Sequence, residues 1–70
     1  MRVKYFPDTD TLLIDFADRD IVETTNINED VLVELDANGG LVSMTIEHAK
    51  ANMDVEDFAF ETVGRQSPPA

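Results

Sequence analysis

The sequence predicts an α+β fold, an antiparallel β-meander of about five strands with one C-terminal α-helix packed on one face of the sheet. Two pairs of segments alternate apolar and polar residues, and turn-forming residues separate the members of each pair. Near the C-terminus the spacing of the apolar residues changes to that of a helix. We therefore expect one domain over residues 1–64 and a disordered tail over residues 65–70.

The first pair of segments predicts a hairpin near the N-terminus. Pro7 suits the second position of a type I turn, and the residues that follow it are typical of turns. A four-residue loop here places Tyr5 opposite Leu12, so that the apolar side chains of both strands lie on one face. On the other face Arg2 then lies opposite Asp15, and opposite charges across two strands are favourable.

A third strand is predicted over residues 21–27, because this segment is rich in β-branched residues. Its alternation is poor, since Ile21 and Ile27 would share a face with Glu23. We therefore expect an edge strand or a β-bulge at this place.

The second pair of segments, residues 31–47, predicts a hairpin whose register follows from its turn. Asn38 and Gly39 suit a two-residue turn in which both residues have a positive φ. This turn pairs Leu35 with Val42 and collects the apolar residues of both strands on one face. The same register gives two further apolar pairs, Val33 with Met44 and Val31 with Ile46.

A short amphipathic helix is predicted after the last strand, from the spacing of the apolar residues between Val55 and Thr62. Asp54 is a suitable N-cap, and Gly64 is a suitable residue to end the helix. We expect this helix to cover the apolar side of the sheet. The side chains expected beneath it are Val3, Tyr5, Leu12, Ile14, Phe16, Val33, Leu35, Val42, Met44 and Ile46.

The chain is strongly acidic, with 15 acidic and 5 basic side chains and a formal net charge of -10. Such a charge repels nucleic-acid phosphates and anionic membrane surfaces, so we expect neither as a partner. No apolar run is long enough to span a membrane, and the N-terminus has no apolar core of a secretory signal. We therefore expect a cytoplasmic protein, and the absence of cysteine fits a reducing compartment.

Several leucines point away from the predicted helix, toward the second face of the sheet. Scattered exposed apolar residues are common in monomers, whereas a contiguous patch indicates a homodimer or a protein partner. Acidic residues beside such a patch would steer a basic protein partner and affect its association rate more than its affinity. The candidate interaction surface consists of Leu13, Leu32, Leu41, Asp15, Glu34, Asp36 and Glu47.

Catalytic and metal-binding patterns are incomplete in this sequence. Ser43 and His48 are separated by an odd number of positions on one predicted strand, so their side chains point to opposite faces. The residues from Asn26 to Asp30 imitate the start of an EF-hand loop, but Val31 stands where that loop needs glycine. We therefore predict no catalytic, cofactor-binding or metal-binding residues, and no cofactor.

The hairpins also resemble a known family. The stretches MRVKYFPDTDTLLIDFAD, IVET and VLVELDANGGLVSMTIEHA are similar to the small prokaryotic family catalogued as Domain of Unknown Function 2283 (DUF2283). The chain departs from the pattern of that family at Phe6, Glu34 and Ser43, which leaves the expected fold intact. The family has no established activity, so the resemblance implies no catalytic residues. Its members are often encoded beside small toxin-like or ribonuclease-like proteins, which implies an antitoxin or accessory role.

We expect a small acidic protein-interaction module that is not an enzyme, forms a homodimer and binds a basic toxin-like or ribonuclease-like partner. A chain of 70 residues without a disulfide has a small core, and self-association is an ordinary source of further stability. One alternative is a small ligand-binding or enzymatic domain whose site forms only at a subunit interface, with Tyr5, His48 and Glu47 as its polar residues. Another is a purely structural, self-assembling subunit.

Overall fold

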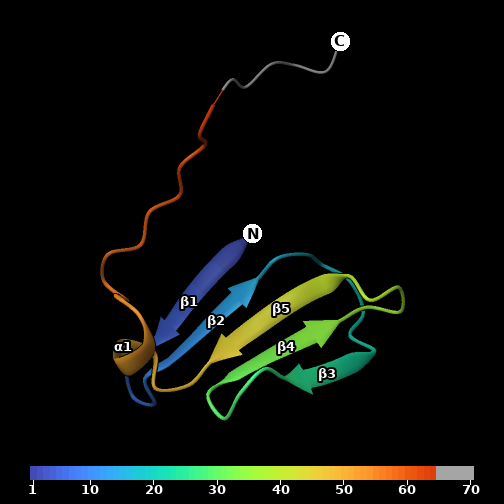
Figure 1. The fold of residues 1–70 in the computed structure, drawn as a ribbon, viewed down its shortest axis with the longest axis horizontal. Coiled ribbons are helices and arrows are strands. Elements are labelled where there is room, and N and C mark those ends of the chain that lie inside the picture. Colours follow the sequence, from blue (N-terminus) through green and yellow to red (C-terminus); the bar gives the residue numbers. More distant parts are fainter. Residues whose placement is uncertain (65–70) are drawn as a thin grey trace.

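The computed structural model describes residues 1–64, in which five strands form one antiparallel sheet and one short helix follows them (Figure 1). The predicted α+β class, with five strands and one helix, is confirmed. The tail predicted for residues 65–70 lies outside the described residues. The elements are β1 (Arg2–Phe6), β2 (Thr11–Asp15), β3 (Glu23–Asn26), β4 (Val31–Leu35), β5 (Leu41–Ile46) and α1 (Ala49–Asn52).

The strands lie side by side in the order β1-β2-β5-β4-β3. β1 and β2 form one hairpin, β3, β4 and β5 form a consecutive three-stranded unit, and the two units join along β2 and β5. Residues 16–22 carry the chain from β2 to the far edge of the sheet (Figure 1). There β3 is an edge strand, as predicted, although it is shorter than the segment 21–27.

The first hairpin has the predicted register. Tyr5 lies opposite Leu12, and Arg2 lies opposite Asp15. The loop ends at Asp10, whose φ of 56° lies in the left-handed region that aspartate adopts more readily than most residues. Alternation and turn chemistry were therefore sufficient to predict this part of the sheet.

The turn of the second hairpin differs from the prediction. Only Gly39 has a positive φ, 78°, whereas Asn38 does not, so the predicted two-residue turn is wrong. The Gly39 N–H donates to the Asp36 carbonyl oxygen at 3.1 Å, and the Asp36 N–H donates to the Gly40 carbonyl oxygen at 2.9 Å. These bonds close a three-residue loop over residues 37–39, with glycine in the left-handed position that such loops favour.

A β-bulge compensates for the longer loop. Leu35 pairs with Leu41 rather than with Val42, and the ladder is irregular next to this pair. The strand β5 absorbs one extra residue there, so that Val33 still lies opposite Met44, as predicted. The apolar pairs beyond the turn are therefore confirmed, although the turn that was expected to set them is not the one observed.

The helix predicted between the N-cap Asp54 and the terminating Gly64 is wrong. The observed helix α1 is shorter and earlier, and residues 53–64, which we call the C-terminal arm, contain neither helix nor strand. Figure 1 shows the arm leading away from the sheet, and its residues are exposed except for the half-buried Val55. A helix of about ten residues is marginal without a surface to pack on, so favourable spacing and caps do not suffice to form it. Within residues 1–64, no helix has the length and apolarity to cross a membrane.

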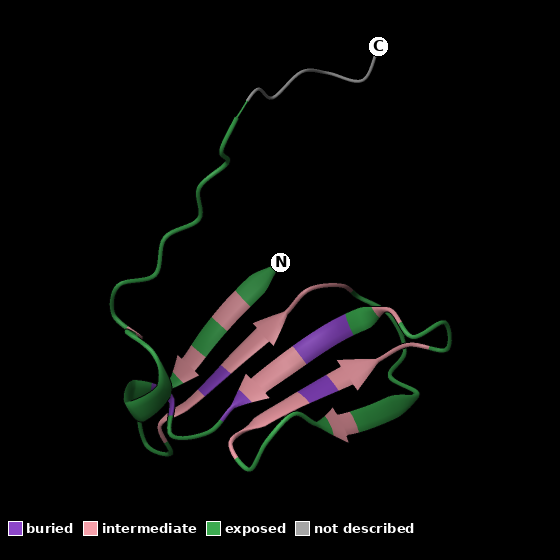
Figure 2. Ribbon diagram, in the orientation of Figure 1, coloured by how far each residue is buried: buried purple, intermediate pink, exposed green. Residues whose placement is uncertain are grey.

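The strand registers collect apolar side chains on one side of the sheet. Ala49 of α1 and Val55 of the C-terminal arm pack near one end of this side, where Leu12 and Ile46 are buried. Figure 2 shows that the buried positions of the sheet lie on β2, β5 and β4, not on the edge strands. We call this side the apolar face; it consists of Val3, Tyr5, Leu12, Ile14, Val31, Val33, Met44 and Ile46. Of the other predicted core residues, Val42 is buried, and Phe16 and Leu35 are half-buried.

Candidate functional site

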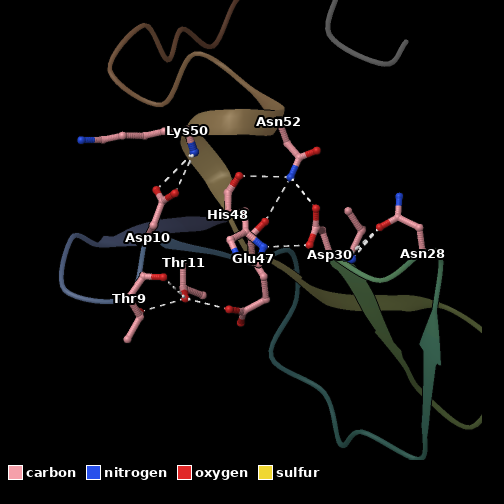
Figure 3. A network of polar contacts seen from close by, with 10 residues as sticks. Thr9, Asp10, Thr11, Asn28, Asp30, Glu47, His48, Lys50 and Asn52 are labelled. Atoms are coloured by element: carbon pink, nitrogen blue, oxygen red, sulfur yellow. Dashed lines mark hydrogen bonds and ion pairs between the residues drawn. The ribbon is translucent and has the colours of Figure 1, made fainter.

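Three connections of the sheet meet beside α1 and bring polar side chains together (Figure 3). They are the β1–β2 loop, the β3–β4 loop and residues 47–48 between β5 and α1. Antiparallel neighbours place these connections at the same end of the sheet. We call the residues gathered there the helix-end cluster; it consists of Tyr5, Asp10, Asp30, Glu47, His48, Lys50 and Asn52.

Asp30 holds the β3–β4 loop to the segment that follows β5. Its Oδ1 lies 2.9 Å from Nδ1 of His48, and its Oδ2 accepts a 3.1 Å hydrogen bond from the Asn52 side-chain amide. Its carbonyl oxygen accepts the Glu47 N–H at 2.7 Å. The Asn52 amide also donates to the carbonyl oxygens of Glu47 and His48, both at 3.1 Å. One loop residue therefore anchors both ends of the segment 47–52.

The contact between Asp30 and His48 shifts the pKa of both side chains. The hydrogen bond to Asp30 raises the pKa of His48 above its ordinary value of 6.5. The hydrogen bonds from His48 and then from Asn52 lower the pKa of Asp30. Both shifts favour the ionised pair, although the His48 side chain stays 72% exposed. His48 has a left-handed backbone, with φ 51° and ψ 48°, and is the residue that precedes α1.

Asp10 holds the β1–β2 loop to the start of α1. Its carboxylate accepts the Tyr5 O–H at 2.6 Å and the Lys50 backbone N–H at 3.2 and 3.3 Å. Its carbonyl oxygen accepts the Ala49 N–H at 2.9 Å. Because the carboxylate stabilises the protonated phenol, the pKa of Tyr5 is raised to about 12. Asp10 thus satisfies N–H groups at the start of α1 that the His48 side chain does not cap.

The helix-end cluster contains an imidazole–carboxylate pair without a nucleophile beside it. In the described residues, no hydroxyl group is hydrogen-bonded to the His48 ring, and the Ser43 hydroxyl donates instead to Glu34 at 2.6 Å. Among residues 1–64 no group of three or more His, Cys, Asp or Glu side chains is arranged to hold a metal ion. The contacts of the cluster hold three connections and α1 together, so the role of the cluster is structural.

The predicted interaction residues are distributed over more than one part of the surface. The registers place two rows of side chains on the side of the sheet opposite the apolar face, which we call the mixed face. From β1 to β3, one row consists of Lys4, Leu13, Thr45, Leu32 and Asn26, and the next consists of Arg2, Asp15, Ser43, Glu34 and Thr24. Leu41 lies outside these rows, opposite Leu35. Glu47 lies at the helix end of the sheet, where it accepts the Thr11 hydroxyl at 3.4 Å.

Asp36 is engaged within the β4–β5 loop. Its Oδ1 accepts the N–H groups of Asn38 and Gly40 at 2.9 and 2.7 Å, and its Oδ2 lies 2.9 Å from Nε of Arg19. The hydrogen bonds from the backbone of Gly40 and then of Asn38 lower the pKa of Asp36. A Cβ on residue 40 would lie 2.8 Å from Oδ2 of Asp36, so glycine leaves the space that the carboxylate occupies. Asp36 therefore organises the loop.

An open hollow lies between the mixed face and the β2–β3 connection. Arg19 in this connection donates to the Leu41 carbonyl oxygen at 3.2 Å and holds the connection to the sheet. Ser43 on the wall of the hollow is only 3% exposed, and its hydroxyl is already bonded to Glu34. The hollow is lined by strand residues that include Arg2, Asp15 and Ser43 and, from the connection, by Phe16, Ala17, Asp18, Arg19 and Ile21.

Sequence reasoning missed Asp10, Asp30 and Asn52 as the residues that hold the helix-end cluster together. The bonds from Asp10 to Lys50 and from Asp30 to Asn52 join residues 40 and 22 positions apart, so no local spacing indicates them. One signal was present in the sequence. Asp10 and Asp30 are each the last loop residue before a strand, which places both at the same end of an antiparallel sheet.

Fold and site together define a small α+β protein built on one five-stranded sheet, with polar side chains that tie its loops together. A family model described as "Protein of unknown function (DUF2283)" matches residues 2–50, and the chain belongs to this family. The matched region contains all five strands and ends within α1, so the C-terminal arm lies beyond it. The resemblance seen in the hairpins is thereby confirmed. No curated protein and no solved structure matches the chain.

Proposed function

We propose that this protein is a non-catalytic protein-interaction module that binds a basic partner through the mixed face, in the manner of an antitoxin. The observation that carries the proposal is the adjacency of two rows on that face. One row holds Leu13 and Leu32, and the next holds Asp15 and Glu34. Apolar side chains at the centre of a contact provide buried area, and neighbouring carboxylates orient a cationic partner.

The charge of the chain supports a basic partner. The formal net charge is -10, and a field of that sign attracts cationic proteins and accelerates their association. The basic residues of the mixed face, Arg2 and Lys4, belong to the edge strand β1, where Arg2 lies opposite Asp15. Glu34 lies on β4, away from both, and the residues opposite it on β3 and β5 are Thr24 and Ser43. A partner that approaches β4 therefore meets a carboxylate that has no basic residue opposite it.

Tyr5, His48 and Glu47, the residues that an enzymatic site would use, all make contacts within the fold, and this supports a non-catalytic role. The hydroxyl of Tyr5 donates to Asp10, and Nδ1 of His48 faces Asp30. Glu47 accepts the Thr11 hydroxyl. Each of these side chains is thus engaged in a contact that ties loops or strands together.

The test compares two double variants that change the net charge equally. Asp15→Asn with Glu34→Gln removes the acidic row of the mixed face. Asp8→Asn with Glu29→Gln removes two exposed carboxylates from loops at the helix end. Tagged wild-type protein is used to isolate a partner from its native host, and the purified pair is followed by biolayer interferometry at two ionic strengths.

We expect the isolated partner to be basic and its association rate to fall at higher ionic strength. The mixed-face variant should reduce the association rate severalfold at low salt, and the loop variant should leave it close to the wild-type value. Recovery of no specific partner, recovery of an acidic one, or equal effects of the two variants would contradict the proposal.

A further inference from the structure

The apolar face lacks a covering layer in the part of the chain that the structure describes. Met44 lies on β5, the central strand of the sheet, and would be deeply buried in a two-layered domain. It is only half-buried, as is Ile14 opposite it on β2. α1 has four residues and packs with Val55 at one end of the face, so the centre of the face is left uncovered.

The uncovered face carries few charged side chains. The rows contributed by β1, β2, β5 and β4 contain no Asp, Glu, Lys or Arg, and Glu23, on the same side opposite Leu35, lies on the edge strand β3. Two copies of a chain with a net charge of -10 repel one another through any acidic surface, so a stable contact between copies requires a neutral region on both. An isologous dimer places the same patch of both subunits in contact, and an apolar patch complements itself.

We infer that the apolar face is covered by the apolar face of a second copy of this chain, giving a homodimer with two stacked sheets. Sheets that pack face to face lie about 10 Å apart, with the inner side chains of both sheets between them. Met44 and Ile14 of each subunit would then lie in the shared core. This places dimerisation on the face that the predicted helix was expected to cover, and leaves the mixed face for a different partner.

The area of the sheet indicates that the C-terminal arm contributes to this dimer. Five strands of about five residues present a face of about 24 Å by about 17 Å, or about 400 Å². A standard interface buries about 800 Å² per partner. Phe58 and Phe60 of the arm are 57% and 74% exposed. Burying both against the other subunit would add about 200–300 Å², which brings the total into the range of weaker stable interfaces.

The test compares two substitutions on the same strand that introduce the same charge. Met44→Glu places a carboxylate on the apolar face, and Thr45→Glu places one on the mixed face; both positions are half-buried. Sedimentation equilibrium of the full chain should show a dimer. Met44→Glu should raise its dissociation constant about a hundredfold or more, since a buried carboxylate would be unpaired, and Thr45→Glu should change it little.

If circular dichroism shows that Met44→Glu is unfolded, a measurement on the wild-type protein tests the inference instead. Mixed dimers of isotope-labelled and unlabelled chains should give intermolecular NOEs to the methyl groups of Met44 and Ile14. A monomer at all concentrations, with the arm folded on its own sheet or not, would overturn the inference. So would a dimer whose intermolecular NOEs arise only from Leu13 and Leu32. Neither result bears on binding of a basic partner, which is measured separately.

Discussion

Asp30 and His48 lie 18 positions apart in the sequence and are joined by a 2.9 Å contact between Oδ1 and Nδ1. Asp30 precedes β4, and His48 follows β5 and precedes α1. The contact therefore fixes the β3–β4 loop against the short segment that leads into the helix. Since Ala49 of α1 and Val55 of the arm pack with Leu12 and Ile46, this pair helps to hold the covered end of the apolar face together.

The first prediction concerns the pH dependence of stability. The pKa of His48 is raised in the folded protein, so its stabilising contribution is complete below the ordinary value of 6.5 and is lost as pH rises through the raised value. The pKa of Asp30 is lowered, so its contribution is present above the ordinary value of 3.8 and is lost as pH falls through the lowered value. The pair should therefore stabilise the fold most between these two ordinary values.

Thermal unfolding by circular dichroism across this range measures the effect. We expect the melting temperature of the wild-type protein to decline as pH rises past neutrality. His48→Asn keeps a residue that tolerates the left-handed backbone but removes the titrating ring, so its curve should be flatter on the alkaline side. Parallel curves for the two proteins above pH 6.5 would show that His48 does not contribute in this way.

The second prediction concerns Tyr5, the only tyrosine in a chain without tryptophan. Ultraviolet absorbance near the phenolate band therefore reports on this residue alone. We expect a midpoint of about 12 in the folded protein and about 10 in denaturant. Since the folded pKa is the higher one, the Tyr5 contribution to stability is present below pH 10 and is lost as pH rises through 12.

Asp10→Asn serves as the matched control for Tyr5, because it removes the negative charge but keeps an oxygen that can accept a hydrogen bond from the phenol O–H. Its Tyr5 midpoint should move back toward 10. Circular dichroism at each pH separates titration of the folded state from alkaline unfolding. A wild-type midpoint near 10 with an intact dichroism spectrum would contradict the Tyr5–Asp10 contact.

The third prediction concerns the β4–β5 loop. Gly39 has a φ of 78°, a conformation that costs a residue with a Cβ about 1–2 kcal/mol. No atom lies within 4 Å of a Cβ built there, so strain of the backbone is the whole effect. Gly39→Ala should lower the free energy of unfolding by about 1 kcal/mol in urea titration, and Gly39→Asn by less. Equal stability of the alanine variant and the wild type would exclude the left-handed turn.

The fourth prediction concerns packing on the apolar face. Ile46 is 8% exposed, between Leu12 and Val31, whereas Ile27 in the β3–β4 loop is 61% exposed. Replacing isoleucine by valine removes one methylene group at either position. Ile46→Val should destabilise the protein by about 0.5–1.5 kcal/mol, and Ile27→Val should have an effect close to zero. The urea titrations are run at one protein concentration, because self-association changes apparent stability.

The prediction of the sheet succeeded where the information is local. Arg2, Tyr5 and Val33 lie opposite the partners that alternation and turn chemistry indicated. The two-residue turn predicted at Asn38 and Gly39 was wrong because the Asp36 carboxylate accepts the N–H groups of Asn38 and Gly40 and so stabilises a longer loop. The residue types at positions 38 and 39 do not indicate these bonds. The longer loop alone would shift β5 by one residue and turn its apolar side chains to the opposite face. The β-bulge compensates for this shift and restores the register.

Neighbouring residues were enough to predict the strands and the division of the sheet into an apolar and a mixed face, because alternation with a period of two is a local property, and composition alone gives the strong negative charge. The position of the helix at α1 instead of between Asp54 and Gly64, and the part that Asp10 and Asp30 play in holding it, depend on the folded sheet. A short helix depends on the surface it packs against, and these hydrogen bonds join loops that only the folded sheet brings together.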